Sequence, residues 1–147
     1  MIAASKLAAA ADRLVTAQQT MRPCRPVREF IEANDLDSAY EVQRTIIGWR
    51  VAAGARRVGR KIGLTNPKVQ AQLGVDQPDF GVLLDDMECA ESSPIDIRRV
   101  LQPKIEAEIA FILAADLDQA NVDETAVFAA TKHVVPAFEI VDSRIAD

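Results

Sequence analysis

Three glutamates on two predicted strands are the residues of this sequence best placed to do chemistry. From residue 105 to residue 113 apolar residues alternate as in a β-strand, so Glu106 and Glu108 point to one face, roughly 6.5–7 Å apart. Glu139 lies inside the apolar run 134–141. Because burying an unpaired carboxylate is expensive, an acid in such a strand needs a cation or a hydrogen-bond donor beside it. Three carboxylates on two strands suit a hard divalent cation such as Mg²⁺ or Mn²⁺.

The same acids allow two other interpretations. A Glu-x-Glu pair is also typical of a solvated strand face, and a single acid in an apolar strand is often paired with a lysine or an arginine. Two carboxylates on one face could also do the acid–base work of a glycosidase. The chain has one Trp and one Tyr, which supply little aromatic surface for a sugar to stack on.

The composition limits the classes of function. A chain of 147 residues with 49% hydrophobic content fits one domain with a real core, and none of its apolar runs is long enough to span a membrane. The net charge of −5 argues against a nucleic-acid partner. Cys24 and Cys89 lack metal-ligand spacing and are expected to be free thiols in a reducing cytoplasm. His133 is the only histidine, which excludes multi-histidine zinc or iron sites and leaves little support for a Ser-His-Asp triad.

The elements that must position these groups follow from periodicity and capping. Two amphipathic helices are predicted in a helical region spanning residues 1–55, the first capped by Ser5 and the second capped by Asp37 or Ser38 and stopped by Gly54. Residues 56–147 form the second region, which carries the candidate catalytic residues. There a further helix is expected from about Asp123 to about His133, followed by the strand that carries Glu139. Because that strand is apolar on both faces, we expect cover on each side of it.

Lys61 is the candidate cation. Residues 56–64 are predicted to form a strand with Gly59, Lys61 and Gly63 on one face, where the two glycines would leave open space for a ligand to approach. An ordinary lysine on a bulged strand is the alternative interpretation. A short helix follows, with Asn66 as its cap and Gly74 as its terminator, and it fixes the direction of the chain that leaves Lys61.

Asp79 lies near a glycine in a stretch with turn signals. The stretch 76–81 combines acids, a proline and a glycine, and is expected to be a loop that presents Asp79.

Several linked motifs resemble, in the same order, those of the 2-keto-4-pentenoate hydratases and their relatives the 2-oxo-3-hexenedioate (4-oxalocrotonate) decarboxylases, both in the fumarylacetoacetate hydrolase superfamily. The motifs are Lys-Ile-Gly-Leu-Thr at 61–65, Gln-Leu-Gly-Val at 72–75, Pro-Asp-Phe-Gly at 78–81, Ile-Glu-Ala-Glu at 105–108 and Glu-Ile-Val-Asp-Ser-Arg at 139–144.

This resemblance implies an α+β fold in which N-terminal helices pack on a partial mixed β-roll, with the C-terminal half missing because family members are considerably longer. Residues 56–147 would then be an incomplete catalytic domain. The resemblance also implies that Glu106, Glu108 and Glu139 hold Mg²⁺ or Mn²⁺. It places Lys61 and Asp79 at the substrate as catalytic residues.

The implied activity is that of a lyase in aromatic-compound catabolism. The ion would chelate the carboxylate and 2-oxygen of a small 2-oxo acid or dienoate, and water would add to a 2-hydroxy-2,4-dienoate, with Lys61 and Asp79 as the proton-transfer pair. Decarboxylation of 2-oxo-3-hexenedioate is the alternative reaction. A non-catalytic remnant or assembly partner is the alternative of another class. A cytoplasmic location and a homo-oligomeric full-length form are also expected.

Overall fold

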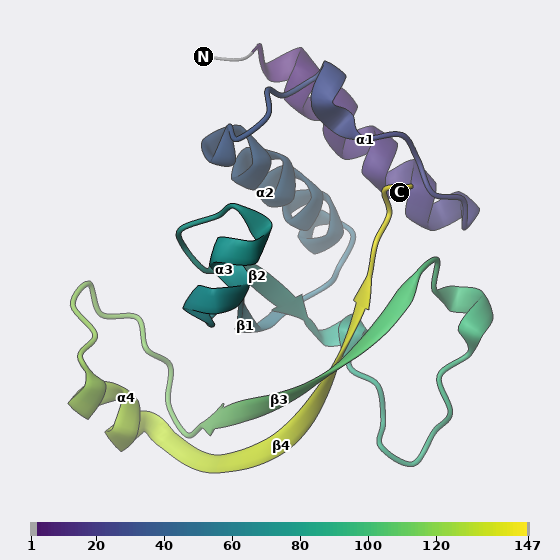
Figure 1. Cartoon of the computed structure of the whole chain (residues 1–147). Coiled ribbons are helices and arrows are strands. Elements are labelled where there is room, and N and C mark those ends of the chain that lie inside the picture. Colours follow the sequence, from purple (N-terminus) through teal and green to yellow (C-terminus); the bar gives the residue numbers. More distant parts are fainter. Residues whose placement is uncertain (1–2, 147) are drawn as a thin grey trace.

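Two helices pack against each other and hold the buried core of the region that the computed structural model describes, which is residues 3–146 (Figure 1). Residues 1, 2 and 147, at the outer ends of the two expected regions, lie outside it. Helix α1 spans Ala4–Thr20 and helix α2 spans Leu36–Ala52. Their interface buries Ala10, Ala11 and Val42, and larger apolar side chains pack around these three. Small residues at the centre let the two helix backbones approach closely.

The helix boundaries correct two predicted caps. Helix α1 starts after Ala3 and already contains Ser5, and its first turn has no side-chain cap. Helix α2 is capped by Asp35, whose Oδ1 accepts a hydrogen bond of 3.1 Å from the N–H of Ser38. Asp35 is favoured over Asp37 because its carboxylate lies three residues before a free N–H group of the first turn. The predicted stop is confirmed, since the helix ends at Ala52 and Gly54 has a φ of 108°.

The first sheet carries the candidate lysine. Strand β1 (Arg57–Gly63) pairs antiparallel with β2 (Asp79–Leu84), and Lys61 lies opposite Gly81 while Gly63 lies opposite Asp79. Helix α3 (Pro67–Leu73) connects them, with Asn66 as its cap and Gly74 in the left-handed conformation at φ 70°, as the sequence predicts. The prediction of a loop at 76–81 is wrong for residues 79–81, because strand β2 begins at Asp79.

Helix α2 closes the outer edge of this sheet. The Tyr40 hydroxyl accepts a hydrogen bond of 3.1 Å from the N–H of Phe80, and Gln43 Nε2 donates to the carbonyl of Phe80 at 3.0 Å. These two side chains satisfy backbone groups that an edge strand would otherwise leave open. Strand β2, and with it Asp79, is thereby fixed to the helical layer.

The second sheet is a long curved ribbon of two strands (Figure 1). Strand β3 (Pro103–Leu113) pairs antiparallel with β4 (Thr131–Asp142). Helix α4 (Glu124–Ala130) precedes β4 and is shorter than predicted, so His133 lies in the strand and not in the helix. Three of the five residues 131–135 are β-branched, one Thr and two Val, and β-branched residues favour a strand over a helix.

The end of β4 returns to helix α1 (Figure 1). Cys24 and Ile145 form an isolated parallel bridge, in which the N–H of Cys24 donates to the carbonyl of Arg144 at 2.9 Å. The guanidinium of Arg144 also donates to Gln18 Oε1 at 2.9 and 3.2 Å. The predicted α+β class is confirmed, and the helical region is tied to the end of the chain that carries the acids.

One face of the β3–β4 ribbon is apolar and exposed. Phe138 is 75% exposed, and Ile105 and Ile109 are each 67% exposed on that face. The cover that we expected on both sides of β4 is not supplied by residues 3–146. Among these residues, no helix has the length and apolar character needed to cross a membrane.

Candidate metal and substrate site

The three glutamates meet on the face of the β3–β4 ribbon that lies opposite the exposed apolar face. Glu106 lies directly across from Glu139 in the antiparallel register, and Glu108 lies across from Ala137. Residues directly opposite each other in such a pair point to the same side, and so do residues two apart along one strand. One carboxylate oxygen from each glutamate lies within 4.8 Å of the others. The structure therefore brings together the three acids that the sequence singled out.

Asp142 holds this register at one end of the ribbon. Its Oδ1 accepts hydrogen bonds from the N–H groups of Leu101 at 2.8 Å and Gln102 at 2.7 Å. Pro103, which follows, has no N–H group to donate to the strand ladder. Asp142 therefore ties the residues that lead into β3 to the end of β4, three residues from Glu139, and the sequence reasoning did not assign it this role.

The donor set fits a hard divalent cation. Mg²⁺ and Ca²⁺ take oxygen ligands at about 2.0–2.6 Å, so two ligands of one ion lie at most about 5 Å apart. The three carboxylate oxygens already satisfy that limit. Glu106 and Glu108 are exposed and Glu139 is half-buried, which leaves room on the open side for waters or a substrate. Glu106, Glu108 and Glu139 are thus the residues that could hold an ion.

Lys61 reaches the acid cluster from the other sheet. Its Nζ lies 3.1 Å from Glu139 Oε2, and both side chains are largely covered, at 28% and 27% exposure. Burial is the largest single influence and by itself would lower the pKa of Lys61, but the hydrogen bond to Glu139 and the surrounding negative charges together raise that pKa above its ordinary value. The negative charges of Asp79 and Glu106 act in the same direction. The interpretation that Glu139 has a lysine partner is confirmed, and that partner belongs to the same site.

Asp79 completes the group, in a way that the sequence did not predict. A Cβ built on Gly63 would collide with the Asp79 carboxylate and would lie 2.9 Å from Lys61 Nζ. The space beside Gly63, which we expected to be open to a ligand, is therefore filled by the two candidate catalytic side chains themselves. Beside Gly59 the nearest side chain is that of Leu83, at 3.7 Å.

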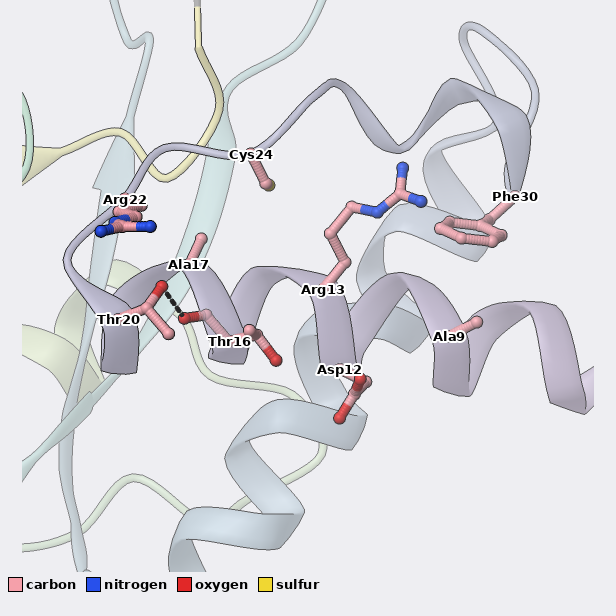
Figure 2. A pocket seen from close by; sticks show the side chains of 9 residues that line it. All are labelled: Ala9, Asp12, Arg13, Thr16, Ala17, Thr20, Arg22, Cys24 and Phe30. Atoms are coloured by element: carbon pink, nitrogen blue, oxygen red, sulfur yellow. Dashed lines mark hydrogen bonds between the residues drawn. The ribbon is translucent and has the colours of Figure 1, made fainter.

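Two hollows lie elsewhere on the surface. One of about 390 Å³ lies along α1, where Figure 2 shows Arg13 beside Phe30, with the guanidinium carbon 4.4 Å from the ring centroid. A second, of about 400 Å³, lies between α2 and the β1–β2 sheet and is lined by Arg44, Arg57 and Arg60 among others. Neither includes a residue of the acid cluster or Lys61. Since Glu106 and Glu108 are exposed, the candidate chemistry lies on an open face of the described residues.

Comparison with known proteins finds similarity to 2-keto-4-pentenoate hydratases over nearly the whole chain. It is 47% identical over 138 residues to the 2-keto-4-pentenoate hydratase of Paraburkholderia xenovorans (strain LB400), covering 94% of this chain and 51% of that enzyme. It is 48% identical over 137 residues to 2-keto-4-pentenoate hydratase 2 of Dechloromonas aromatica (strain RCB), covering 93% of this chain and 52% of that one. No family model matches the chain.

A solved structure matches nearly the whole fold. It is 4-oxalocrotonate decarboxylase from Pseudomonas putida G7, complexed with magnesium and adipate, with a TM-score of 0.88 and 30% sequence identity. The match covers 99% of this chain and 55% of that one. The same enzyme has also been solved in complex with calcium and acetate. The resemblance inferred from the linked motifs is confirmed: the chain is a homologue of the 2-keto-4-pentenoate hydratases, and it spans about half the length of the curated relatives it matches.

Proposed function

We propose that this chain carries the metal-binding and proton-transfer groups of a hydratase that adds water to a 2-hydroxy-2,4-dienoate. The observation that carries the proposal is the convergence of Glu106, Glu108 and Glu139 beside Lys61, on a fold shared with an enzyme solved with magnesium. Glu106, Glu108 and Glu139 would hold Mg²⁺ or Mn²⁺, which when bound acts as a Lewis acid toward a 2-oxo oxygen. The two relatives described above, at 47% and 48% identity, are hydratases, which supports this reaction over others.

The net charge of the proposed site explains why a cation such as Lys61 is needed to bind the substrate. Three carboxylates and one divalent cation leave one net negative charge, and a 2-oxo acid brings another. The Lys61 ammonium is held at the edge of the acid cluster, where it can offset the charge of the substrate carboxylate. Because Lys61 is already paired with Glu139, an incoming substrate gains a cation that is oriented before binding.

Lys61 and Asp79 are the proposed proton-transfer pair. Hydration of a 2-hydroxy-2,4-dienoate requires a proton at C5, the hydroxyl of water at C4 and the remaining proton of that water at C3, while the 2-hydroxyl proton is lost as the 2-oxo group forms. Lys61 Nζ and an Asp79 carboxylate oxygen both lie against the same face of Gly63, so one can donate and the other accept on the same side of a bound dienoate. Asp79 in a strand is held more firmly for this task than it would be in a loop.

Decarboxylation of 2-oxo-3-hexenedioate is the second candidate. The observation that favours it is the TM-score of 0.88 with 4-oxalocrotonate decarboxylase. Its reaction would use the same carboxylates, and loss of CO₂ would replace the addition of water. The higher identity to the hydratases, 47% against 30%, makes hydration the first choice.

The experiment is a paired assay of the chain with Mg²⁺ or Mn²⁺. Loss of the ultraviolet absorbance of 2-hydroxypenta-2,4-dienoate measures hydration, and CO₂ release from 2-oxo-3-hexenedioate measures decarboxylation. Glu106→Gln should abolish turnover, and Glu91→Gln, at an exposed position between β2 and β3, should leave it unchanged. Turnover that survives both a chelator and Glu106→Gln would refute the proposal.

We also propose a cytoplasmic location and a homo-oligomeric full-length form. The free thiols of Cys24 and Cys89 support a reducing compartment. The exposed apolar face of β3 and β4 supports association with further protein surface.

A further inference from the structure

The β1–β2 sheet places each candidate catalytic side chain opposite a glycine. Lys61 pairs with Gly81, and Asp79 pairs with Gly63. These four residues share one face of the sheet, since directly opposed residues and residues two apart point to the same side. Lys61 and Asp79 therefore occupy one diagonal of a square, and the two glycines occupy the other.

Because Gly63 and Gly81 have no side chains, the side chains of Lys61 and Asp79 can occupy the space above them. A Cβ on Gly81 would lie 3.0 Å from Cγ and 3.1 Å from Cδ of Lys61, so the lysine stem passes over the position that a side chain at 81 would take. A Cβ on Gly63 would collide with the Asp79 carboxylate and lie 2.9 Å from Lys61 Nζ. Neither glycine has a positive φ, so it is side-chain space and not backbone conformation that calls for glycine here.

We propose that Gly63 and Gly81 are positioning residues, which make the cross-strand gaps that direct Lys61 and Asp79 toward each other and Lys61 onward to Glu139. This inference rests on the proposed function, because the position of the Lys61 ammonium matters through the acids that it meets. An alanine at either position would displace the ammonium from Glu139. It would do so without removing any charged group from the site.

The same strand offers a matched control. Gly59 lies on the same face of β1, two residues before Lys61, and a Cβ there would meet only Leu83 at 3.7 Å, which is ordinary van der Waals contact. Gly59→Ala, Gly63→Ala and Gly81→Ala therefore add the same methyl group to one sheet face. Only the last two touch Lys61 or Asp79.

The first measurement is the affinity of the chain for Mn²⁺, by titration calorimetry. Lys61 competes with an ion for Glu139, so Lys61→Met should raise the affinity about three- to fifteenfold. Gly81→Ala and Gly63→Ala should also raise the Mn²⁺ affinity. Because they act through Lys61, neither should raise it further in a double variant with Lys61→Met. Gly59→Ala should leave the affinity unchanged. Suppose that Lys61→Met raises the Mn²⁺ affinity while Gly63→Ala and Gly81→Ala bind Mn²⁺ as the parent does. That result would overturn the inference about the glycines but would not contradict the proposed metal site.

The second measurement needs no metal. The Lys61 Cε resonance in the carbon NMR spectrum, assigned by its loss in Lys61→Met, should move in Gly63→Ala and Gly81→Ala toward its position in Glu139→Gln. It should stay in place in Gly59→Ala. An unmoved resonance in both alanine variants would refute the positioning role. A moved resonance in a chain that binds no Mn²⁺ would support positioning and contradict the proposed function. If Gly63→Ala does not fold, Gly81→Ala decides, because its added methyl meets only the methylene groups of Lys61.

Discussion

Replacing Lys61 with methionine should strengthen metal binding and stop turnover. The change keeps a side chain of similar length and removes one positive charge that lies 3.1 Å from Glu139 Oε2. An ion held by that carboxylate would be about 2.0–2.6 Å from the oxygen, and therefore at most about 6 Å from Lys61 Nζ.

The size of the effect follows from Coulomb's law. A charge of +2 and a charge of +1 about 5 Å apart repel by about 1.7 kcal/mol in water, which is the appropriate medium because both side chains remain more than a quarter exposed. This repulsion corresponds to roughly a fifteenfold difference in affinity, and a lysine that swings toward solvent would reduce it to about threefold. The effect should shrink as salt is added, since exposed charges are screened.

Titration of Mn²⁺ into the parent and into Lys61→Met would measure this gain. Lys68→Met, which makes the same change in net charge on α3, is the control and should show little change. An affinity that falls in Lys61→Met would mean that the lysine supports the metal site instead of competing with the ion. Unchanged turnover in Lys61→Met would remove Lys61 from the mechanism.

Four further outcomes are expected. Glu106→Gln should weaken Mn²⁺ binding more than tenfold, whereas a calorimetric titration equal to that of the parent would rule out this ligand. Asp142→Ala should cost about 2 kcal/mol in urea unfolding, because two N–H groups lose a charged acceptor. The N–H and guanidinium of Arg56 lower the pKa of Asp85, so its contribution to stability is present above about pH 4 and is lost as pH falls through its folded pKa. Asp85→Asn should therefore lose less stability than the parent between pH 5 and pH 3. Size-exclusion chromatography should show association through the exposed β3–β4 face, and a clean monomer with full activity would contradict it.

The local features of the chain were predictable because they depend on neighbours in the sequence. Alternation placed Glu106 and Glu108 on one strand face, and an asparagine, a proline and a glycine defined α3 from Asn66 to Gly74. The linked motifs predicted the relationship to the hydratases. Boundaries failed where two local preferences compete, as at His133, where a helical pattern meets a run of β-branched residues.

Asp79 was predicted to lie in a loop for a related reason. Proline and glycine around it favour a loop locally, but pairing with Gly63 of β1 and the hydrogen bonds from α2 to Phe80 draw the stretch into a strand. Contacts between distant segments outweigh a turn preference of this size.

By itself the sequence determined which residues could do chemistry and which of them share a strand. The tertiary structure decided how those strands meet: Glu106 faces Glu139 in the β3–β4 register, and Asp142 fastens one end of that ladder. It also decided that Lys61 crosses from one sheet to the other, over glycines that leave it room. Periodicity fixes the direction of a side chain relative to its own strand, whereas the distance between two strands depends on pairing and packing across the whole fold.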